Sequence, residues 1–437
     1  MLFMSDQPLR LSFPSSRPVI KAEVDLPGSK SISNRALLIL QLAGVSPRNW
    51  LSGLSSARDT VTLRDLLEHG GDIFNAGDAG TTFRFLTAYL ALGDQQTILT
   101  GSARMRERPV GALVDALRAL GADIEYLEKE GYPPLGIHPS PGLGRTTKSI
   151  RVPAGVSSQF LSALLMIGPR LPEGLELIPE GKLVSRPYLD MTLRMMRYFG
   201  ARADWQDDRL IVAPGQYEAR PLSVESDWSA ASYWYALAAL SAEADILLKG
   251  LQPDSWQGDS VLAEMMTAFD VQTTFEAGGA RLRRGGKAIK THFEWDFTEC
   301  PDLAQTLAVV CAALGVRGLF SGLETLSIKE TDRVSALKNE LSKVGTSFSR
   351  LPDRFSAKRP DSTFYLLEGA AHWDNPPVFA TYGDHRMAMA FAPLALRSAV
   401  DIENPAVVGK SYPDFWSHLV DAGFETESRD LQPGASH

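Results

Sequence analysis

Residues 31–44 read SISNRALLILQLAG, and this composition is that of a buried helix. Apolar residues surround the predicted helix nearly all the way round, whereas a helix at a protein surface keeps a polar face. Serines stand before the apolar run, where they can cap a helix. Five further segments repeat the pattern, at residues 78–93, 157–168, 227–241, 302–315 and 383–398. The sequence therefore predicts six buried helices.

A second, amphipathic helix is predicted after each buried one. These partners begin at residues 57, 109, 187, 259, 331 and 415, which is 26 to 32 residues after the buried helix begins. A glycine or alanine and a strand-like run usually follow, as in residues 121–126 and 200–205. Any α/β protein alternates helices and strands, but six matched pairs at this spacing favour six related α/β units.

Composition limits what kind of protein this is. A chain of 437 residues with 44% hydrophobic and 22% charged residues is long enough for two or three domains with buried cores. The net charge of −8 provides no general attraction for nucleic acid, so an anionic ligand needs a local cluster of cations. The chain shows no signal peptide and no apolar run of membrane-spanning length, so we expect a cytoplasmic protein without membrane or nucleic-acid partners.

Cysteine and histidine usage predicts neither a disulfide framework nor a metal site. The only cysteines, Cys300 and Cys311, are too few for a framework and too far apart for a CxxC motif, which fits a reducing cytosol. The seven histidines form no HExxH or HxH pair.

The beginnings of the buried helices are candidate binding sites, because helix N-termini favour anions. The first start, residues 26–35, reads LPGSKSISNR; it is not a Walker A loop, because Glu23 stands where the first glycine of that loop should be. Ser31 and Ser33 can cap the helix there, while Lys30 and Arg35 supply cations for a phosphate or carboxylate. The alternative is a capped helix with two solvated bases.

The second and third starts also carry ligand-binding residue types. Residues 78–84 read DAGTTFR, and the arginines of RMRERP at 104–109 would repel one another without a bound anion; a solvated basic loop is the alternative. Residues 157–159 are Ser-Ser-Gln, and SRPY follows at 185–188. Their hydroxyl and amide groups suit sugar hydroxyls or phosphate oxygens.

The last starts combine acids with bases. Asp302 follows Pro301, KETDR occupies 329–333, DHR occupies 384–386, and Lys410 precedes the final helix. These residue types can transfer protons beside an anion. Alternatively, Asp302 is an N-cap and Glu330 pairs with Arg333 at i,i+3.

Taken together and in order, PGSKSISNRA, RMRERP, VSSQF, KETDR, DHRMAM and the lysine before the last Pro-Asp closely resemble the 5-enolpyruvylshikimate-3-phosphate synthase family, from residue 27 to about 415. The resemblance implies an α/β fold of two lobes, each with three βαβαββ-type units, forming a two-lobed inside-out α/β barrel. Lobe I would comprise residues 1–28 and 225–437, lobe II residues 29–224, with the active site in the cleft between them.

The resemblance also implies the reaction. The enolpyruvyl group of phosphoenolpyruvate would pass to the 5-hydroxyl of shikimate 3-phosphate through a tetrahedral intermediate, in a monomer without metal or cofactor. Asp302, Glu330 and Lys30 would be the catalytic residues, with Asp302 as base on the attacking hydroxyl. Shikimate 3-phosphate would be bound by Lys30, Ser31, Arg35, Ser157, Ser158, Gln159, Ser185, Tyr188, Asp302 and Lys329. Phosphoenolpyruvate would be bound by Lys30, Gly80, Arg108, Gln159, Arg333, Arg386 and Lys410.

Three positions depart from the family pattern. Asp78 and Thr325 each stand where asparagine is usual, and Phe85 stands where proline is usual. The changes at Asp78 and Phe85 could alter the phosphoenolpyruvate pocket and its tolerance of the herbicide glyphosate.

Three other functions compete with this hypothesis. UDP-N-acetylglucosamine enolpyruvyl transferases usually carry a reactive cysteine or aspartate on a loop near their Arg-containing segment, and neither Cys300 nor Cys311 lies there. An RNA 3′-phosphate cyclase-like protein would need a nucleotide site and a basic surface. An inactive anion-binding protein would not be expected to keep Lys30, Asp302 and Glu330 together.

Overall fold

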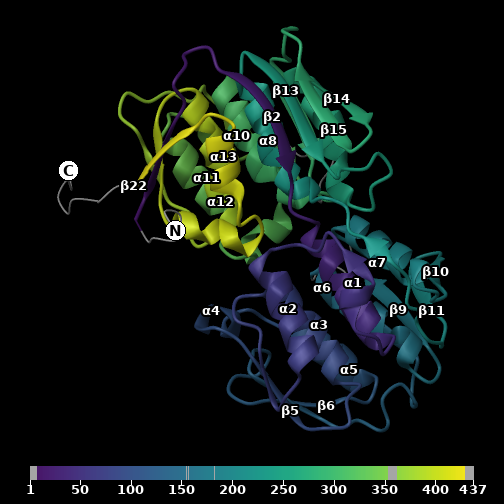
Figure 1. Ribbon diagram of the computed structural model, residues 1–437. Helices are drawn as coiled ribbons and strands as arrows, with labels where there is room; N and C mark the ends of the chain where they lie inside the picture. Colours follow the sequence, from purple (N-terminus) through teal and green to yellow (C-terminus); the bar gives the residue numbers. More distant parts are fainter. Residues whose placement is uncertain (1–6, 154, 156, 182, 353–361, 429–437) are drawn as a thin grey trace. The chain divides into compact units, whose positions relative to one another are not determined.

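The computed structural model describes residues 7–428 except 154, 156, 182 and 353–361. The chain divides into two compact units, which we call unit 1 (Met1–Pro27 with Ser226–His437) and unit 2 (Gly28–Glu225) (Figure 1). The sequence placed these crossings after residues 28 and 224. Each unit is described by itself below.

Unit 2 contains three sheets in its described residues. Two of them have four strands, in the orders β4-β5-β7-β6 and β8-β9-β11-β10. The first two strands of each sheet are parallel and the remaining neighbours are antiparallel. The strands are β4 Ile73–Asn75, β5 Thr97–Thr100, β6 Asp123–Tyr126, β7 Leu135–His138, β8 Ser149–Pro153, β9 Leu175–Glu180, β10 Ala203–Gln206 and β11 Arg209–Val212.

The third sheet of unit 2 joins the two ends of the unit. Strand β3 (Leu51–Ser52) pairs in parallel with β12 (Leu222–Ser223), far along the chain. Unit 2 is therefore closed by its own residues.

Unit 1 repeats the same sheet plan and uses the N-terminal segment to complete it. Its sheet orders are β2-β13-β15-β14, β16-β17-β19-β18 and β20-β21-β1-β22, so β1 lies between two strands from the end of the chain. The strands are β1 Leu9–Ser12, β2 Val19–Asp25, β13 Glu243–Lys249, β14 Val271–Glu276, β15 Gly279–Arg284, β16 His292–Asp296, β17 Arg317–Ser321, β18 Ser347–Arg350, β19 Tyr365–Glu368, β20 Val378–Phe379, β21 Val400–Ile402 and β22 Glu425–Ser428.

The six predicted buried helices are present, which with the repeated sheets confirms the predicted α/β class. They are α1 Lys30–Leu42, α3 Gly80–Leu90, α6 Ser158–Ile167, α8 Trp228–Leu240, α10 Ala304–Leu314 and α12 His385–Phe391. Helix α12 is short because Pro393 follows it, and the chain continues as a 3-10 helix (Ala392–Leu396).

Five of the six amphipathic partners are regular helices: α2 Arg58–His69, α5 Gly111–Ala119, α7 Arg186–Tyr198, α11 Arg333–Ser342 and α13 Phe415–Asp421. The fourth is different. Instead of one helix beginning at residue 259, the chain forms two 3-10 turns, Gly258–Val261 and Met266–Phe269, around the one-turn helix α9 (Leu262–Met265). The buried Asp259 lies in the first of these turns.

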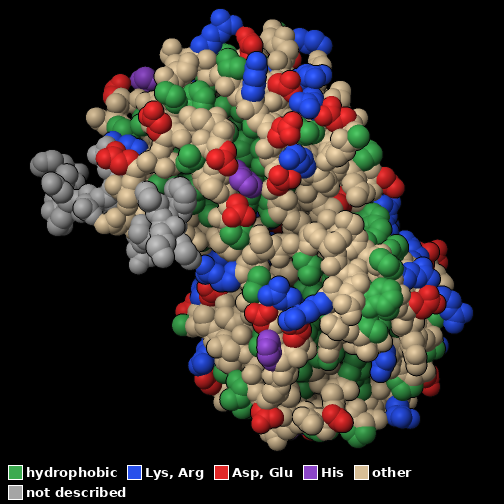
Figure 2. Space-filling view, in the orientation of Figure 1, with side chains coloured by type: hydrophobic (Ala, Val, Ile, Leu, Met, Phe, Trp, Pro, Cys, Tyr) green, Lys and Arg blue, Asp and Glu red, His purple; other side chains and the backbone are tan. Residues whose placement is uncertain are grey.

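Side-chain caps fix where the buried helices begin. Ser29, not Ser31 or Ser33, caps α1, because its hydroxyl accepts from the amide of Ile32 at 3.5 Å; Ser33 instead accepts from the amide of Ser55. Asp227 caps α8 by the same kind of bond. None of the described helices is long and apolar enough to cross a bilayer. Figure 2 shows acidic and basic side chains interspersed on the visible surface.

Candidate active site

The beginnings of four helices, α1, α2, α3 and α6, are held together within unit 2. The Lys30 ammonium, at the first residue of α1, lies 3.1 Å from a carboxylate oxygen of Asp59 in the first turn of α2. The Thr82 hydroxyl of α3 donates to the Asp59 carbonyl at 2.9 Å, and the Gln159 amide of α6 donates to the Thr81 hydroxyl at 3.0 Å. The predicted convergence of polar helix starts is therefore present in this unit.

Arg35 is a buried cation surrounded by neutral groups. Its side chain is 2% exposed; Nε donates to Thr192 at 2.7 Å and Nη2 donates to Ser162 at 3.0 Å. The rings of Phe85 and Tyr188 lie 5.5 and 5.9 Å from the guanidinium carbon. Burial lowers the pKa of Arg35 to about 10. Because a buried charge needs a countercharge, this position favours an anionic ligand.

Gly80 lies beneath two guanidinium groups at the first residue of α3. A Cβ built at Gly80 would come within 2.6 Å of an Nη1 atom of both Arg84 and Arg108, and Arg84 also donates to the Gly80 carbonyl at 3.0 Å. The Nε of Arg108 is buried without a hydrogen-bond acceptor among the described residues. A side chain at this position would have to displace the guanidinium ends of Arg84 and Arg108.

The other two arginines of the 104–109 motif behave differently. Arg104 lies 2.7 Å from Glu107 and Arg106 lies 2.8 Å from Glu128. The expectation that the motif needs an anion to relieve self-repulsion is wrong for these two arginines, because the carboxylates of Glu107 and Glu128 neutralise them.

The hydroxyls of the third start are presented by α6 and α7. The Ser157 hydroxyl caps α6 by accepting from the backbone amide of Gln159 at 3.3 Å. Ser158, the first residue of that helix, is buried. Ser185 precedes α7 with a left-handed φ of 56° and makes no capping hydrogen bond. Such a conformation is strained for serine and is typical of functional positions. Ser31 lies on α1, where its carbonyl accepts from Arg35 at 2.9 Å.

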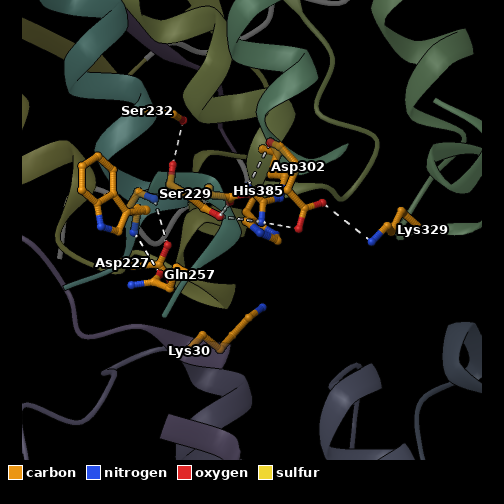
Figure 3. A network of polar contacts seen from close by, with 12 residues as sticks. Lys30, Asp227, Ser229, Ser232, Gln257, Asp302, Lys329 and His385 are labelled. Atoms are coloured by element: carbon orange, nitrogen blue, oxygen red, sulfur yellow. Dashed lines mark hydrogen bonds and ion pairs between the residues drawn. The ribbon is translucent and has the colours of Figure 1, made fainter. Parts of the chain in front are cut away.

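In unit 1, Asp302 is the centre of a second cluster. One of its oxygens accepts from Arg333 at 2.8 Å, the other accepts from Arg386 at 2.9 Å, and the Lys329 ammonium lies 3.7 Å away (Figure 3). Burial alone would raise the pKa of Asp302, but the charges of Arg386, Lys329 and Arg333 outweigh it and hold this pKa well below its usual range. Burial lowers the pKa of Lys329, although Asp302 opposes this shift.

These contacts decide between the earlier alternatives for the acids. Asp302 is not an N-cap, because α10 begins at Ala304 and is preceded by a 3-10 turn. Glu330 does form the i,i+3 pair, at 2.8 Å from Arg333. Arg333 is 1% exposed, yet its pKa is raised, because Asp384, Glu330 and Asp302 together outweigh the effect of burial.

The sixth start belongs to the same cluster. Asp384 accepts from Arg333 Nε at 2.7 Å and from the backbone amide of Arg386 at 2.8 Å, so it both caps α12 and binds the arginine of α11. Lys410 donates to the Gly383 carbonyl at 3.1 Å. Arg386 is thus placed beside Asp302 by α12, and Lys410 contacts the loop before that helix.

Sequence reasoning missed several supporting residues. Asp59 received no role, although its place in the first turn of α2 is a signal for an acid at a helix start. Four other residues belong to no motif in the sequence. Thr192 and Ser162 bind Arg35, and Ser229 and Asp259 lie beside Arg386.

The structure shows the contacts of the three residues that depart from the family pattern, Asp78, Phe85 and Thr325. Asp78 accepts from the Ser102 hydroxyl, and Phe85 packs against Arg35. Thr325 has a buried hydroxyl without a hydrogen-bond partner in the described part of the chain. Within that same part, no group of three His, Cys, Asp or Glu side chains is arranged to hold a metal ion.

Comparison with known proteins gives one consistent family. The model of EPSP synthase (3-phosphoshikimate 1-carboxyvinyltransferase) matches residues 52–419. A 3-phosphoshikimate 1-carboxyvinyltransferase of Bacteroides fragilis is 46% identical over 95% of this chain and 97% of its own length, and one of Photorhabdus laumondii is 35% identical over 92% and 96%. The structure of an EPSP synthase from Acinetobacter baumannii has a TM-score of 0.74 at 21% identity, covering 96% of this chain and all of that one.

Proposed function

Because the chain belongs to the EPSP synthase (3-phosphoshikimate 1-carboxyvinyltransferase) family, we propose that its two polar clusters bind and convert the substrates of that reaction. The protein transfers the enolpyruvyl group of phosphoenolpyruvate to shikimate 3-phosphate in the shikimate pathway. The observation that carries the assignment of residues is the Asp302 cluster, in which one carboxylate lies beside three cations that can bind the phosphate and carboxylate groups of an anionic substrate.

We assign shikimate 3-phosphate mainly to unit 2. Arg35 is a buried cation among neutral partners, and Ser157, Ser158 and Ser185 present hydroxyls at the starts of α6 and α7. A phosphate with a polyhydroxylated ring meets both requirements, because it supplies the countercharge and accepts from hydroxyls. Tyr188 packs against Arg35 and Gln159 reaches across to α3, so both are proposed to contact the ring.

We assign phosphoenolpyruvate to Arg333, Arg386 and Lys410 of unit 1 and to Lys30, Gly80, Arg108 and Gln159 of unit 2. These groups provide forked and compact cations for a carboxylate and a phosphate. Lys329 completes the positive surroundings of Asp302 and is assigned to shikimate 3-phosphate. The expected position of both substrates between the lobes stays a prediction.

The chemistry proceeds by addition and elimination. A proton is added to the methylene carbon of phosphoenolpyruvate, the 5-hydroxyl of shikimate 3-phosphate attacks the resulting cationic carbon, and Asp302 takes the hydroxyl proton. The tetrahedral product then loses a methyl proton and its phosphate, so the C–O bond breaks and the enol ether remains. Lys30 and Glu330 are the proposed groups for proton exchange at the methyl carbon and the phosphate.

The ion pairs of Asp302 give a physical reason for its activity as a base. In the free protein, its three cations hold its pKa low and make it a weak base. When substrate anions bind Arg333, Arg386 and Lys329, the same cations stabilise the Asp302 carboxylate less. Its pKa then rises, and the base becomes effective only when the site is filled.

Phosphate release tests this assignment. We expect release from phosphoenolpyruvate with shikimate 3-phosphate and none with UDP-N-acetylglucosamine; activity with only the sugar nucleotide would overturn it. Asp302→Ala should lower kcat by about 10²–10⁴-fold while shikimate 3-phosphate still binds. Equal loss of binding and turnover would make Asp302 a structural residue. We also propose a cytoplasmic monomer without cofactor, which size-exclusion chromatography with light scattering checks for oligomeric state.

A further inference from the structure

The start of α8 is the one buried-helix start that the proposed function leaves without a role. It reads Asp227-Trp228-Ser229, and Ser229 is the single residue of α8 that is not buried. Figure 3 shows Ser229 pointing toward the Asp302 cluster, on the side away from Lys329. The contacts of Ser229 explain why a polar side chain stands at this position of a mostly apolar helix.

Ser229 connects a buried acid to the Asp302 cluster. Its hydroxyl bonds to a carboxylate oxygen of Asp259, and its oxygen lies 3.4 Å from Nη2 of Arg386. The same Nη2 atom donates to Asp302 at 2.9 Å. Because serine has one donor and two acceptor lone pairs, donation to Asp259 turns a lone pair toward Arg386.

The contact between Ser229 and Asp259 is positioned by hydrogen bonds to the backbone near the start of α8. The Gln257 side chain accepts from the Trp228 amide at 3.1 Å and donates to the Ser226 carbonyl at 2.8 Å, which fixes the 257–259 segment against the start of α8. Asp227 caps the helix through the Ala230 amide at 3.0 Å. Hydrogen bonds from the Gln257 and Asp227 side chains to the backbone around the start of α8 therefore help to hold Asp259 next to Ser229.

We propose that Ser229 and Asp259 are positioning residues for phosphoenolpyruvate binding: the Ser229 hydroxyl, oriented by Asp259, fixes the guanidinium of Arg386. Arg386 then has three acceptors, namely the Asp302 carboxylate, the Asp302 carbonyl at 3.3 Å from Nη1 and the Ser229 hydroxyl, and together they fix the orientation in which the guanidinium meets the ligand. The inference rests on the proposed role of Arg386 in phosphoenolpyruvate binding.

The cost of burying Asp259 supports a specific role. Asp259 is 5% exposed. Burial, together with the charge of Asp302, raises its pKa to about 6, while Arg386 and the Ser229 hydroxyl act in the opposite sense. A carboxylate in such a place is unfavourable unless it is hydrogen-bonded, and Ser229 provides that bond.

Steady-state kinetics with each substrate varied separately tests the proposal. Ser229→Ala and Asp259→Ala should each raise KM for phosphoenolpyruvate about 5- to 20-fold, with KM for shikimate 3-phosphate within about twofold of wild type. Asp259→Asn keeps an acceptor for Ser229 and should stay within about threefold for both substrates. The matched control is Ser232→Ala, one turn further along α8; its hydroxyl bonds to the Ser229 carbonyl and to Thr306 but not to Arg386, so both KM values should be unchanged.

Arg386→Ala separates failure of this proposal from failure of the proposed function. If Arg386→Ala leaves KM for phosphoenolpyruvate unchanged, the assignment of Arg386 itself is wrong. If Arg386→Ala raises that KM but Ser229→Ala does not, the positioning role is wrong. Equal increases in both KM values for Ser229→Ala, or the same effect in Asp259→Asn as in Asp259→Ala, would also overturn it.

Discussion

Gly80 shows how one absent side chain shapes the site. A methyl group there would overlap Nη1 of both Arg84 and Arg108. We expect Gly80→Ala to displace these guanidinium groups and weaken phosphoenolpyruvate binding by about 1–3 kcal/mol, which corresponds to roughly a 5- to 150-fold increase in KM. Gly142→Ala is the control, because no atom lies within 4 Å of its built Cβ. An unchanged KM for phosphoenolpyruvate in Gly80→Ala would contradict the proposed position of this ligand.

Asp259 also predicts a pH dependence of stability. Its folded pKa of about 6 exceeds the unfolded value of about 3.9, so the folded state binds the proton more tightly. The resulting stabilisation is complete below the unfolded pKa and is lost as pH rises through 6. Asp302, Asp227, Arg386 and Ser229 are the groups that act on Asp259, and the net effect of burial and like charge is the raised pKa.

Replacing Asp259 by a residue that does not ionise should therefore stabilise the protein most at high pH. The free energy of unfolding of Asp259→Asn, relative to wild type, should increase between pH 5 and pH 8, by about 1.4 kcal/mol. Urea denaturation at both pH values measures the difference. Asp207→Asn, on the exposed turn between β10 and β11, is the control. A difference that does not vary with pH would show that Asp259 keeps an ordinary pKa.

At the scale of elements, Glu340 of α11 holds the loop before α12. This fully buried carboxylate accepts from the Ala380 amide at 2.9 Å, the Tyr382 hydroxyl at 2.7 Å and the Lys343 ammonium at 2.6 Å. Tyr382 has a left-handed φ of 54°, and Gly383, whose carbonyl accepts from Lys410, follows it. Glu340 thus stabilises a strained loop that carries site residues.

Loss of this carboxylate should destabilise the protein and disturb the loop. We expect Glu340→Ala to lower the free energy of unfolding by about 3 kcal/mol, because it leaves buried donors without an acceptor. Tyr382→Phe removes one of the bonds and should cost about 1 kcal/mol. Chemical denaturation gives both values. A loss no larger in Glu340→Ala than in Tyr382→Phe would mean that the backbone holds the loop without the carboxylate.

At the scale of the molecule, the two units differ in how they depend on the N-terminal segment. Unit 2 contains every strand of its own sheets, whereas unit 1 needs β1 and β2 from before residue 28. Leu9 of β1 lies opposite Ser428 of β22, so the first residue of β1 is adjacent to the last residue of β22.

Fragments should reflect this difference. We expect residues 28–225 to fold cooperatively alone, and residues 226–437 to fail because β21 and β22 lose the strand between them. Joining residue 428 to residue 9 by a short linker, in a chain that begins at 226 and ends at 27, should restore folding. Circular dichroism during thermal unfolding checks all three; a cooperative transition for residues 226–437 alone would contradict the expectation.

The sequence by itself determined the six-fold repetition and the helix starts that carry polar residues. Burial patterns and spacing are local properties, so residues 31–44 could be recognised as a buried helix without knowing their neighbours. For the same reason, the KETDR and DHR segments could be named as places for acids and cations before their contacts were known.

Tertiary structure alone decided which of these residues meet and in what electrostatic state. Arg35 binds Thr192, 157 residues away, and Asp302 binds Arg386, 84 residues away. The low pKa of Asp302, the role of Asp59 and the Ser229–Asp259 contact all depend on such pairs. No local pattern contains them, because hydrogen bonds and charge interactions depend on distance in space, which packing of remote segments sets.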